Sequence, residues 1–249
     1  MKTEGCKFVQ RTDKKTVLIP GFLEGDFGRE VNTEVQGKYE KFNAVSTIAY
    51  NEKTNLVQGS NLFYVVAVNE VLRENRLKIR TATQADLERM LKTRGIDLKE
   101  VYEDTALVLR NKENPNSYLA KDLIKQIQSR KPKQEMPVMI PLNGLELQED
   151  SDSKYGLSFR LRDDSDIIYA PILNKGNGNF SSEDINEKIG LPEKLVNNGN
   201  RTLYTRDSGI SRLCLNRGLV LYSGWYDLTN SGSDGRVVLV GCEATTNQE

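Results

Sequence analysis

Histidine is absent from this chain of 249 residues, and its absence excludes several kinds of chemistry. Catalysis by Ser-His-Asp or Cys-His arrangements needs an imidazole as the base, so neither arrangement is available. Zinc sites with histidine ligands are excluded for the same reason, as is the iron site made of two histidines and one carboxylate. We expect no catalytic residues, no metal site and no cofactor.

Cysteine is also scarce, and long apolar runs are missing. Cys6, Cys214 and Cys242 lie far apart and form no C-x-x-C motif, which argues against a thiolate zinc site or a disulfide framework. No run approaches the ~18 apolar residues of a membrane span, and residues 1–6 show no apolar signal-peptide region. We expect no membrane span and no signal peptide. The location stays open between the cytoplasm, a virion and export by a non-standard route.

Net charge is the third missing feature, because 35 Lys and Arg balance 35 Asp and Glu. A neutral chain argues against electrostatic binding of nucleic acid. Acidic clusters at 149–152 and 163–166 do not fit the EF-hand spacing and are interpreted as solvated turns. Gly176-x-Gly178 lacks the third glycine of a dinucleotide-binding motif and is interpreted as a loop.

The sequence of the first eighty residues predicts mainly β-strands. Short strands are predicted at 16–21 and 42–50. The apolar run 61–68 fits either a buried strand or the start of a helix that continues through Leu72. We therefore expect residues 1–60 to form an N-terminal β extension.

Two helices are predicted in the middle of the chain. The first begins at Thr83, where Asp86 three residues later completes a short capping box, and Gly95 ends it. The second begins at Asn116 or Ser117 and stops at Lys131-Pro132. Strands are predicted before, between and after the helices, at 105–109, 137–142, 157–161, 167–169, 202–205, 213–221 and 237–240. The order indicates one α+β domain over residues 1–249, with mixed and antiparallel sheets and two helices.

A compositional gap near the C-terminus is the strongest signal. From Leu195 through Cys242 there is no Lys, Glu or Gln, where simple proportion predicts ~7 Lys and Glu. Leucines recur in this stretch at 213, 215, 219, 221 and 228. Their spacing is typical of a framework that buries one face of a sheet or tight loop.

The residue types between these leucines share a genetic property. Cys, Asn, Arg, Gly, Val, Tyr, Ser, Asp and Thr are all reached by substituting adenines in an AAC or AAT codon. Lys, Glu, Gln and Met are not reached, because such codons end in a pyrimidine. The same types suit a binding surface, since Tyr gives large amphipathic contacts while Ser, Gly and Asn give adaptable hydrogen bonds.

This stretch resembles the variable region of the target proteins of diversity-generating retroelements. In that family an error-prone reverse transcriptase mutates adenines while copying a template repeat into the 3′ end of the target gene. Residues 234–238, Asp-Gly-Arg-Val-Val, resemble the closing strand of the family's C-type lectin-like fold, although the aromatic that follows the glycine is missing. The lead-in at 201–211 is most similar to archaeal and archaeal-virus members.

The resemblance implies a C-type lectin-like domain whose variable segment spans about 195–242 on the C-terminal strands and loops. It implies a non-enzymatic protein whose partner is a protein or glycan on a cell or virus surface. The framework would be Leu213, Leu215, Leu219, Leu221, Leu228, Arg236, Val237 and Val238. The ligand-facing, variable residues would be Cys214, Asn216, Arg217, Gly218, Val220, Tyr222, Gly224, Tyr226, Asp227, Asn230, Gly232 and Ser233.

Trp225 joins these ligand-facing residues, although a tryptophan codon ends in a purine and cannot come from AAC or AAT. It is either a fixed aromatic anchor or a copy of another template codon. Two alternatives stay open. One is an ordinary polar hairpin region that happens to lack Lys and Glu. The other is a calcium-dependent glycan binder or an enzyme on the related lectin-like fold of formylglycine-generating enzymes, whose cysteine pair has no recognisable counterpart in Cys214 and Cys242.

Overall fold

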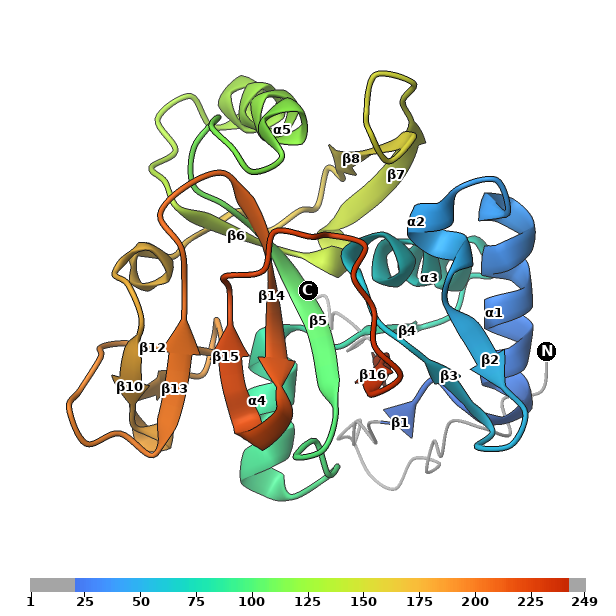
Figure 1. The fold of residues 1–249 in the computed structure, drawn as a ribbon, viewed down its shortest axis with the longest axis horizontal. Coiled ribbons are helices and arrows are strands. Elements are labelled where there is room, and N and C mark those ends of the chain that lie inside the picture. The colour runs from blue at the N-terminus through green and yellow to red at the C-terminus, as the bar shows by residue number, and fades with distance from the viewer. Residues whose placement is uncertain (1–20, 242–249) are drawn as a thin grey trace, which may run out of the picture.

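The computed structural model describes residues 21–241, and it shows a mixed α+β arrangement in which helices flank a large sheet (Figure 1). The predicted α+β class is confirmed. The prediction of two helices is wrong, because residues 21–241 contain five α-helices. These are α1 (Gly25–Tyr39), α2 (Asn43–Ser46), α3 (Leu62–Glu74), α4 (Gln84–Thr93) and α5 (Ser117–Arg130).

The strands form one large sheet and several small ones. In chain order they are β1 (Gly21–Phe22), β2 (Ala49–Asn51), β3 (Leu56–Gln58), β4 (Ile79–Thr81), β5 (Tyr102–Leu109), β6 (Val138–Pro141), β7 (Leu145–Glu149), β8 (Leu157–Leu161), β9 (Ile168–Tyr169), β10 (Gly178–Phe180), β11 (Ile185–Asn186), β12 (Leu191–Pro192), β13 (Arg201–Tyr204), β14 (Ile210–Asn216), β15 (Val220–Tyr222), β16 (Gly235–Arg236) and β17 (Val238–Gly241). The large sheet has the order β10-β13-β15-β14-β5-β6-β9, and β16 also pairs with β5. A second sheet has the order β1-β17-β4, and β2-β3, β7-β8 and β11-β12 are hairpins.

The expected N-terminal β extension is wrong for residues 21–60, which are partly helical. In α1 the buried residues Phe27, Val31 and Val35 recur every four positions and cover one helical face. This spacing is helical, and it outweighs the β-like composition of the surrounding residues. Helix α2 likewise takes up residues 43–46 of the strand predicted at 42–50, and only residues 49–50 belong to a strand, β2. Residues 16–20 of the first predicted strand lie outside the described residues.

The ambiguous apolar run at 61–68 is resolved as helix α3. The Asn61 side chain caps it by accepting a hydrogen bond from the Tyr64 amide at 2.8 Å. Nearly all of the helix is buried, and α1 packs on one side of it and β7 on another. Burial on every side removes the periodicity by which an amphipathic helix is recognised.

The two helices that the sequence did predict are present. In α4 the Thr83 hydroxyl accepts from the Asp86 amide, and the Asp86 carboxylate accepts from the Thr83 amide at 2.9 Å, which confirms the capping box. The helix ends at Thr93, and Arg94 takes the left-handed conformation with φ 53°. Helix α5 begins after Asn116, but the Asn116 side chain makes no capping bond.

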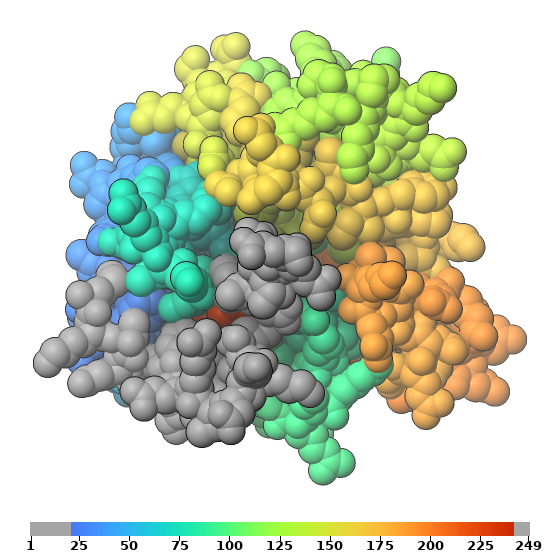
Figure 2. Space-filling model, turned by 180° about the vertical axis from the view of Figure 1, so that it is seen from behind, coloured from blue at the N-terminus to red at the C-terminus, as the bar shows by residue number. Residues whose placement is uncertain are grey.

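Alternation along β5 divides the core into two parts. Leu107 and Leu109 pack with α1, α3 and α5 on one face of the large sheet, while Ala106 and Val108 pack on the other. Figure 2 shows the side opposite to Figure 1, where segments up to about residue 205, coloured blue to orange, form most of the surface outside the grey atoms. The last strands are seen mainly in Figure 1.

Candidate ligand-binding surface

The β14–β15 hairpin separates a leucine face from a polar and aromatic face. Leu213, Leu215 and Leu221 are at most 1% exposed and belong to one core. The neighbouring residues along the strands point to the other face of the sheet. There Cys214 of β14 pairs with Tyr222 of β15, and Tyr222 pairs with Tyr204 of β13. The alternation of strand side chains therefore places every second residue of the hairpin on the second face.

Residues 223–234 cross this second face on the way from β15 to β16, as the red segment in Figure 1 shows. The half-buried Trp225 ring lies 4.4 Å from the Tyr222 ring, centroid to centroid. Tyr102 of β5 meets the same indole edge-on at 6.4 Å and 84°. The crossing segment is thus packed onto the sheet through its tryptophan.

Most of the ligand-facing residues expected from the sequence have accessible side chains or main chain. Twelve of the thirteen are partly or fully exposed: Asn216, Arg217, Gly218, Val220, Tyr222, Gly224, Trp225, Tyr226, Asp227, Asn230, Gly232 and Ser233. Leu228 between them is buried, as expected of a framework residue. This arrangement is what a ligand-facing surface requires, and binding itself stays a prediction.

Cys214 is the exception, and the structure corrects our assignment of it to the ligand-facing set. Its side chain is fully buried, in a row between Tyr222 and Asp104. Burial raises the pKa of the thiol, because an apolar environment disfavours the thiolate. The free thiol is thus an inert packing group within the sheet.

Four aromatic residues form what we call the aromatic surface: Tyr204, Tyr222, Trp225 and Tyr226. The Tyr204 and Tyr222 ring centroids are 5.2 Å apart, which extends the Tyr222–Trp225 contact into a row. Tyr226 is 57% exposed, and the Arg206 guanidinium lies 5.3 Å from its ring centroid. The sequence pattern did not indicate Tyr204 or Arg206 as site residues, since the parallel pairing of β13 with β15 brings Tyr204 and the segment after it to the site.

Side chains from outside the crossing segment hold its first residues by their carbonyl groups. Buried Arg110 donates to the Ser223 carbonyl at 3.1 Å, and the Ser211 hydroxyl donates to the same oxygen at 2.8 Å. Arg206 donates to the Gly224 carbonyl at 3.1 Å. Burial, with the nearby charge of Arg206, lowers the pKa of Arg110 to about 9, so the group is still cationic at neutral pH.

The middle of the segment is held by one main-chain bond and by two asparagine side chains. The Arg212 amide donates to the Trp225 carbonyl at 3.0 Å. The Asn116 side chain donates to the Tyr226 carbonyl at 2.7 Å, and this bond replaces the helix cap that its sequence position suggested. Asn61 donates to the Thr229 carbonyl at 3.2 Å while its carbonyl oxygen caps α3.

The end of the segment is anchored by Arg212 and Tyr102. Arg212 donates to the Asn230 carbonyl at 2.5 Å, and the Tyr102 hydroxyl accepts from the Gly232 amide at 2.7 Å. A bidentate ion pair with Asp104 holds the Arg212 guanidinium in place. The described contacts thus fix carbonyl and amide groups of the segment at seven positions between 223 and 232.

One expected framework residue departs from the leucine pattern. Leu219 is only half-buried and has φ 62°, because it closes the turn between β14 and β15. Its carbonyl accepts from Arg201 at 2.8 Å, and a buried bidentate pair with Glu88 orients Arg201. Arg236 is also only half-buried, whereas Val237 and Val238 lie in the core as expected.

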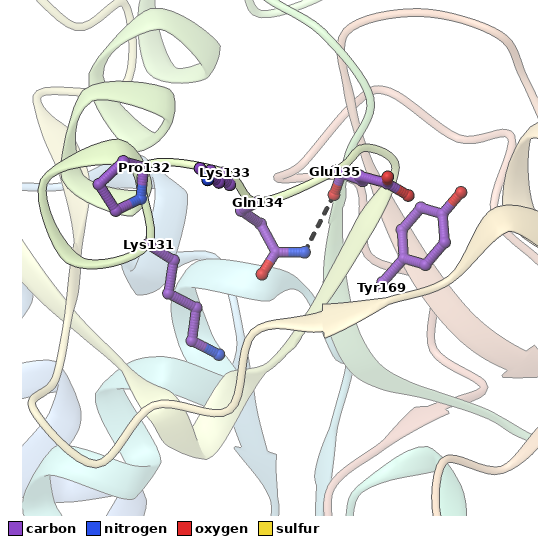
Figure 3. A pocket seen from close by; sticks show the side chains of 6 residues that line it. All are labelled: Lys131, Pro132, Lys133, Gln134, Glu135 and Tyr169. Atoms are coloured by element: carbon purple, nitrogen blue, oxygen red, sulfur yellow. Dashed lines mark hydrogen bonds between the residues drawn. The ribbon is translucent and has the colours of Figure 1, made fainter.

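A further surface hollow lies away from this segment, and its lining does not form a catalytic arrangement (Figure 3). It measures about 620 Å³ and lies between residues 131–135 and Tyr169. The side chains that Figure 3 draws do not converge, and the dashed bond runs from the Gln134 amide to the Glu135 carbonyl. Tyr169 belongs to β9, at the end of the large sheet away from β13 and β15.

No convergence of three acidic or cysteine side chains, as a metal ion would need, is found within residues 21–241. Of the two acidic clusters, 149–152 lies at the turn of the β7–β8 hairpin and 163–166 follows β8. In the second cluster a hydrogen bond from Arg162 lowers the pKa of Asp164. None of the helices in this part of the chain has the length and apolar character to cross a membrane.

Comparison of the chain with protein-family models, with curated proteins and with solved structures gives no match.

Proposed function

We propose that this chain is a non-enzymatic binding protein whose C-terminal surface is diversified by a retroelement that mutates adenines. The proposal includes a C-type lectin-like fold of the archaeal type of variable protein. The observation that carries it is the anchoring of residues 223–232 through main-chain atoms by side chains that lie outside the variable positions.

Anchoring of this kind separates the shape of the segment from the identity of its side chains. Every residue type except proline carries the same carbonyl and amide groups, so replacement of Tyr226 leaves the Asn116 bond intact. Several residues that hold the segment, among them Asn61, Tyr102 and Asp104, come before the compositional gap in the sequence. A surface under continual replacement needs such a scaffold, because its own side chains cannot be relied on for stability.

The exposed residues supply the usual chemistry of a binding surface. Tyr204, Tyr222 and Trp225 offer a nearly continuous row of rings, and Tyr226 offers a ring that is more than half exposed. Aromatic anchors of this kind dominate binding energy in protein interfaces, while Ser, Gly and Asn adapt their hydrogen bonds to different partners. The proposed partner is a protein or glycan on a cell or virus surface.

The genetic part of the proposal is tested by deep sequencing of the 3′ end of this gene in its natural population, together with the flanking DNA. We expect substitutions to concentrate in codons 214–233 and to match adenines in a nearby, nearly identical repeat. The codons of Leu213, Leu215 and Leu221 should not vary. Scattered variation without a repeat would overturn the retroelement origin.

The binding part is tested with a display library in which the twelve exposed positions are randomised. Selection against one folded protein, such as lysozyme, should yield binders that keep the parental melting temperature within a few degrees. A matched library that randomises the anchoring residues Asn61, Tyr102, Arg110 and Asn116 should yield few folded members. Equal recovery from both libraries would show that the anchors do not support the surface.

A further inference from the structure

A cavity of about 510 Å³ lies beside the crossing segment, and none of its lining residues is acidic. We call it the lysine pocket. Its lining comes from the α1–α2 connection, α2 and the residue after it, the β7–β8 turn, and Thr229 of the crossing segment. Its size is within the range of small-ligand sites in proteins.

The lysine pocket combines aromatic walls with cationic groups at its rim. The Lys154 ammonium lies 4.7 Å from the Tyr155 ring centroid, and the Lys41 ammonium lies 5.2 Å from the Phe42 ring centroid. Lys41 also pairs with the exposed Glu149 at 2.9 Å. Among the residues that the structure describes, no carboxylate forms an ion pair with Lys154. Lys154 is therefore the cation of this lining whose charge is not paired.

Hydrogen bonds link the wall of the lysine pocket to the crossing segment. The Tyr155 hydroxyl donates to the Asn116 side-chain oxygen at 2.9 Å, and the Asn116 amide group donates to the Tyr226 carbonyl at 2.7 Å. Thr229 lines the pocket directly. A partner that covers Tyr226 and Asp227 would therefore also lie over the mouth of the pocket.

The lysine pocket belongs to the constant part of the chain. Apart from Thr229, its lining residues lie between 41 and 156, far before the compositional gap. Lys41 and Lys154 are also of a type that mutation of AAC or AAT codons cannot produce. Diversification would therefore leave the lining residues other than Thr229 unchanged.

We propose that the lysine pocket is a constant subsite that takes a carboxylate carried on an apolar body, such as an acidic side chain beside an aromatic one on the partner protein. The aromatic walls remove water from the apolar part, and Lys154 attracts the carboxylate at the rim. This inference rests on the proposed function in one respect, that the partner lies on the neighbouring variable surface.

Phenylacetate is a suitable probe, because it carries one carboxylate on one ring. In a titration followed by amide NMR, we expect signals of Phe42, Tyr155, Gly156 and Thr229 to shift, with a dissociation constant in the millimolar range. Neutral 2-phenylacetamide has the same shape and should bind about three- to tenfold more weakly. Added salt should weaken the phenylacetate binding only.

The variant Lys154→Gln should weaken phenylacetate binding by about three- to tenfold, since an exposed ion pair has a modest energy. Lys133→Gln is the matched control, because Lys133 is also exposed and lines a different hollow. Absence of shifts at the pocket, equal binding of the amide, or an equal effect of the control would overturn the subsite. If phenylacetate binds while the randomised library yields no binders, the pocket stands and the proposed function fails.

Discussion

The Arg212 guanidinium donates two hydrogen bonds of 2.5 Å to the two carboxylate oxygens of Asp104, and both side chains are at most 1% exposed. Desolvation offsets much of the attraction in a buried pair, so such a pair is weak grounds for stability by itself. The geometry of the pair has a consequence for the crossing segment. Asp104 orients the guanidinium so that its remaining nitrogen reaches the Asn230 carbonyl of the crossing segment.

Asp104→Asn should lower the free energy of unfolding by about 3–5 kcal/mol, because it leaves Arg212 charged and unpaired in the interior. Urea denaturation measures the change. The pair of Arg217 and Asp234, at 2.6 Å with side chains 59% and 22% exposed, is the control. Arg217→Gln should cost less than about 1 kcal/mol. Equal costs would show that burial of the Asp104 pair has no special effect.

Asn116→Gly should loosen the crossing segment locally. Asn116 has φ 61°, which glycine adopts readily, so the substitution removes the side-chain bonds without straining the main chain. Loss of the bonds to Tyr226 and Tyr155 should cost about 1 kcal/mol each at most. Hydrogen exchange of the amides at 226–229 should become about five- to tenfold faster. Unchanged exchange at 226–229 would show that these bonds do not restrain the segment.

Tyr226→Ala should barely change the melting temperature, because surface substitutions mostly stay within about 0.5 kcal/mol. Tyr222→Ala should cost somewhat more, about 1 kcal/mol, since it removes two ring contacts. Leu221→Ala should cost about 2–5 kcal/mol, because Leu221 is fully buried. Thermal unfolding of the three variants gives the order. A cost for Tyr226→Ala near that of Leu221→Ala would contradict the assignment of Tyr226 to an exposed, replaceable surface.

Leu219 should reverse the usual ranking of alanine and glycine. At φ 62° a residue with a Cβ atom is strained by roughly 1 kcal/mol, whereas glycine is not. We expect Leu219→Gly to be more stable than Leu219→Ala by about 0.5–1 kcal/mol in chemical denaturation. If the alanine variant is the more stable one, the turn does not have this conformation in solution.

Glu103 should make stability depend on pH. Its side chain is fully buried, and burial raises its pKa well above the ordinary value, so the folded protein holds a proton that the unfolded chain has released. Stability is therefore lost as the pH rises above about 4.5, the region of the unfolded pKa, toward the raised folded pKa. Glu103→Gln lacks this loss, so its stability relative to the parent should increase with pH. Parallel pH profiles for the two proteins would show that Glu103 titrates normally.

The sequence determined the local features that depend on neighbouring residues. The capping box of Thr83 and Asp86, the boundaries of β6, β8 and β17, and the buried leucines of the hairpin follow from patterns a few residues long. It did not reveal α1, since the four-residue spacing of Phe27, Val31 and Val35 is set among polar residues typical of loops. It left α3 undecided, because a helix buried on all sides shows no amphipathic period.

The sequence by itself also indicated that Leu213, Leu215 and Leu221 share one buried face, because strand side chains alternate in direction. Only the tertiary structure decided that Cys214 is buried, because its neighbours Asp104 and Tyr222 belong to other strands. Likewise, the contacts of Asn61, Tyr102 and Asn116 with the crossing segment span more than 100 residues of chain. Hydrogen bonds over such separations depend on how the sheet and helices are assembled, and no local pattern encodes them.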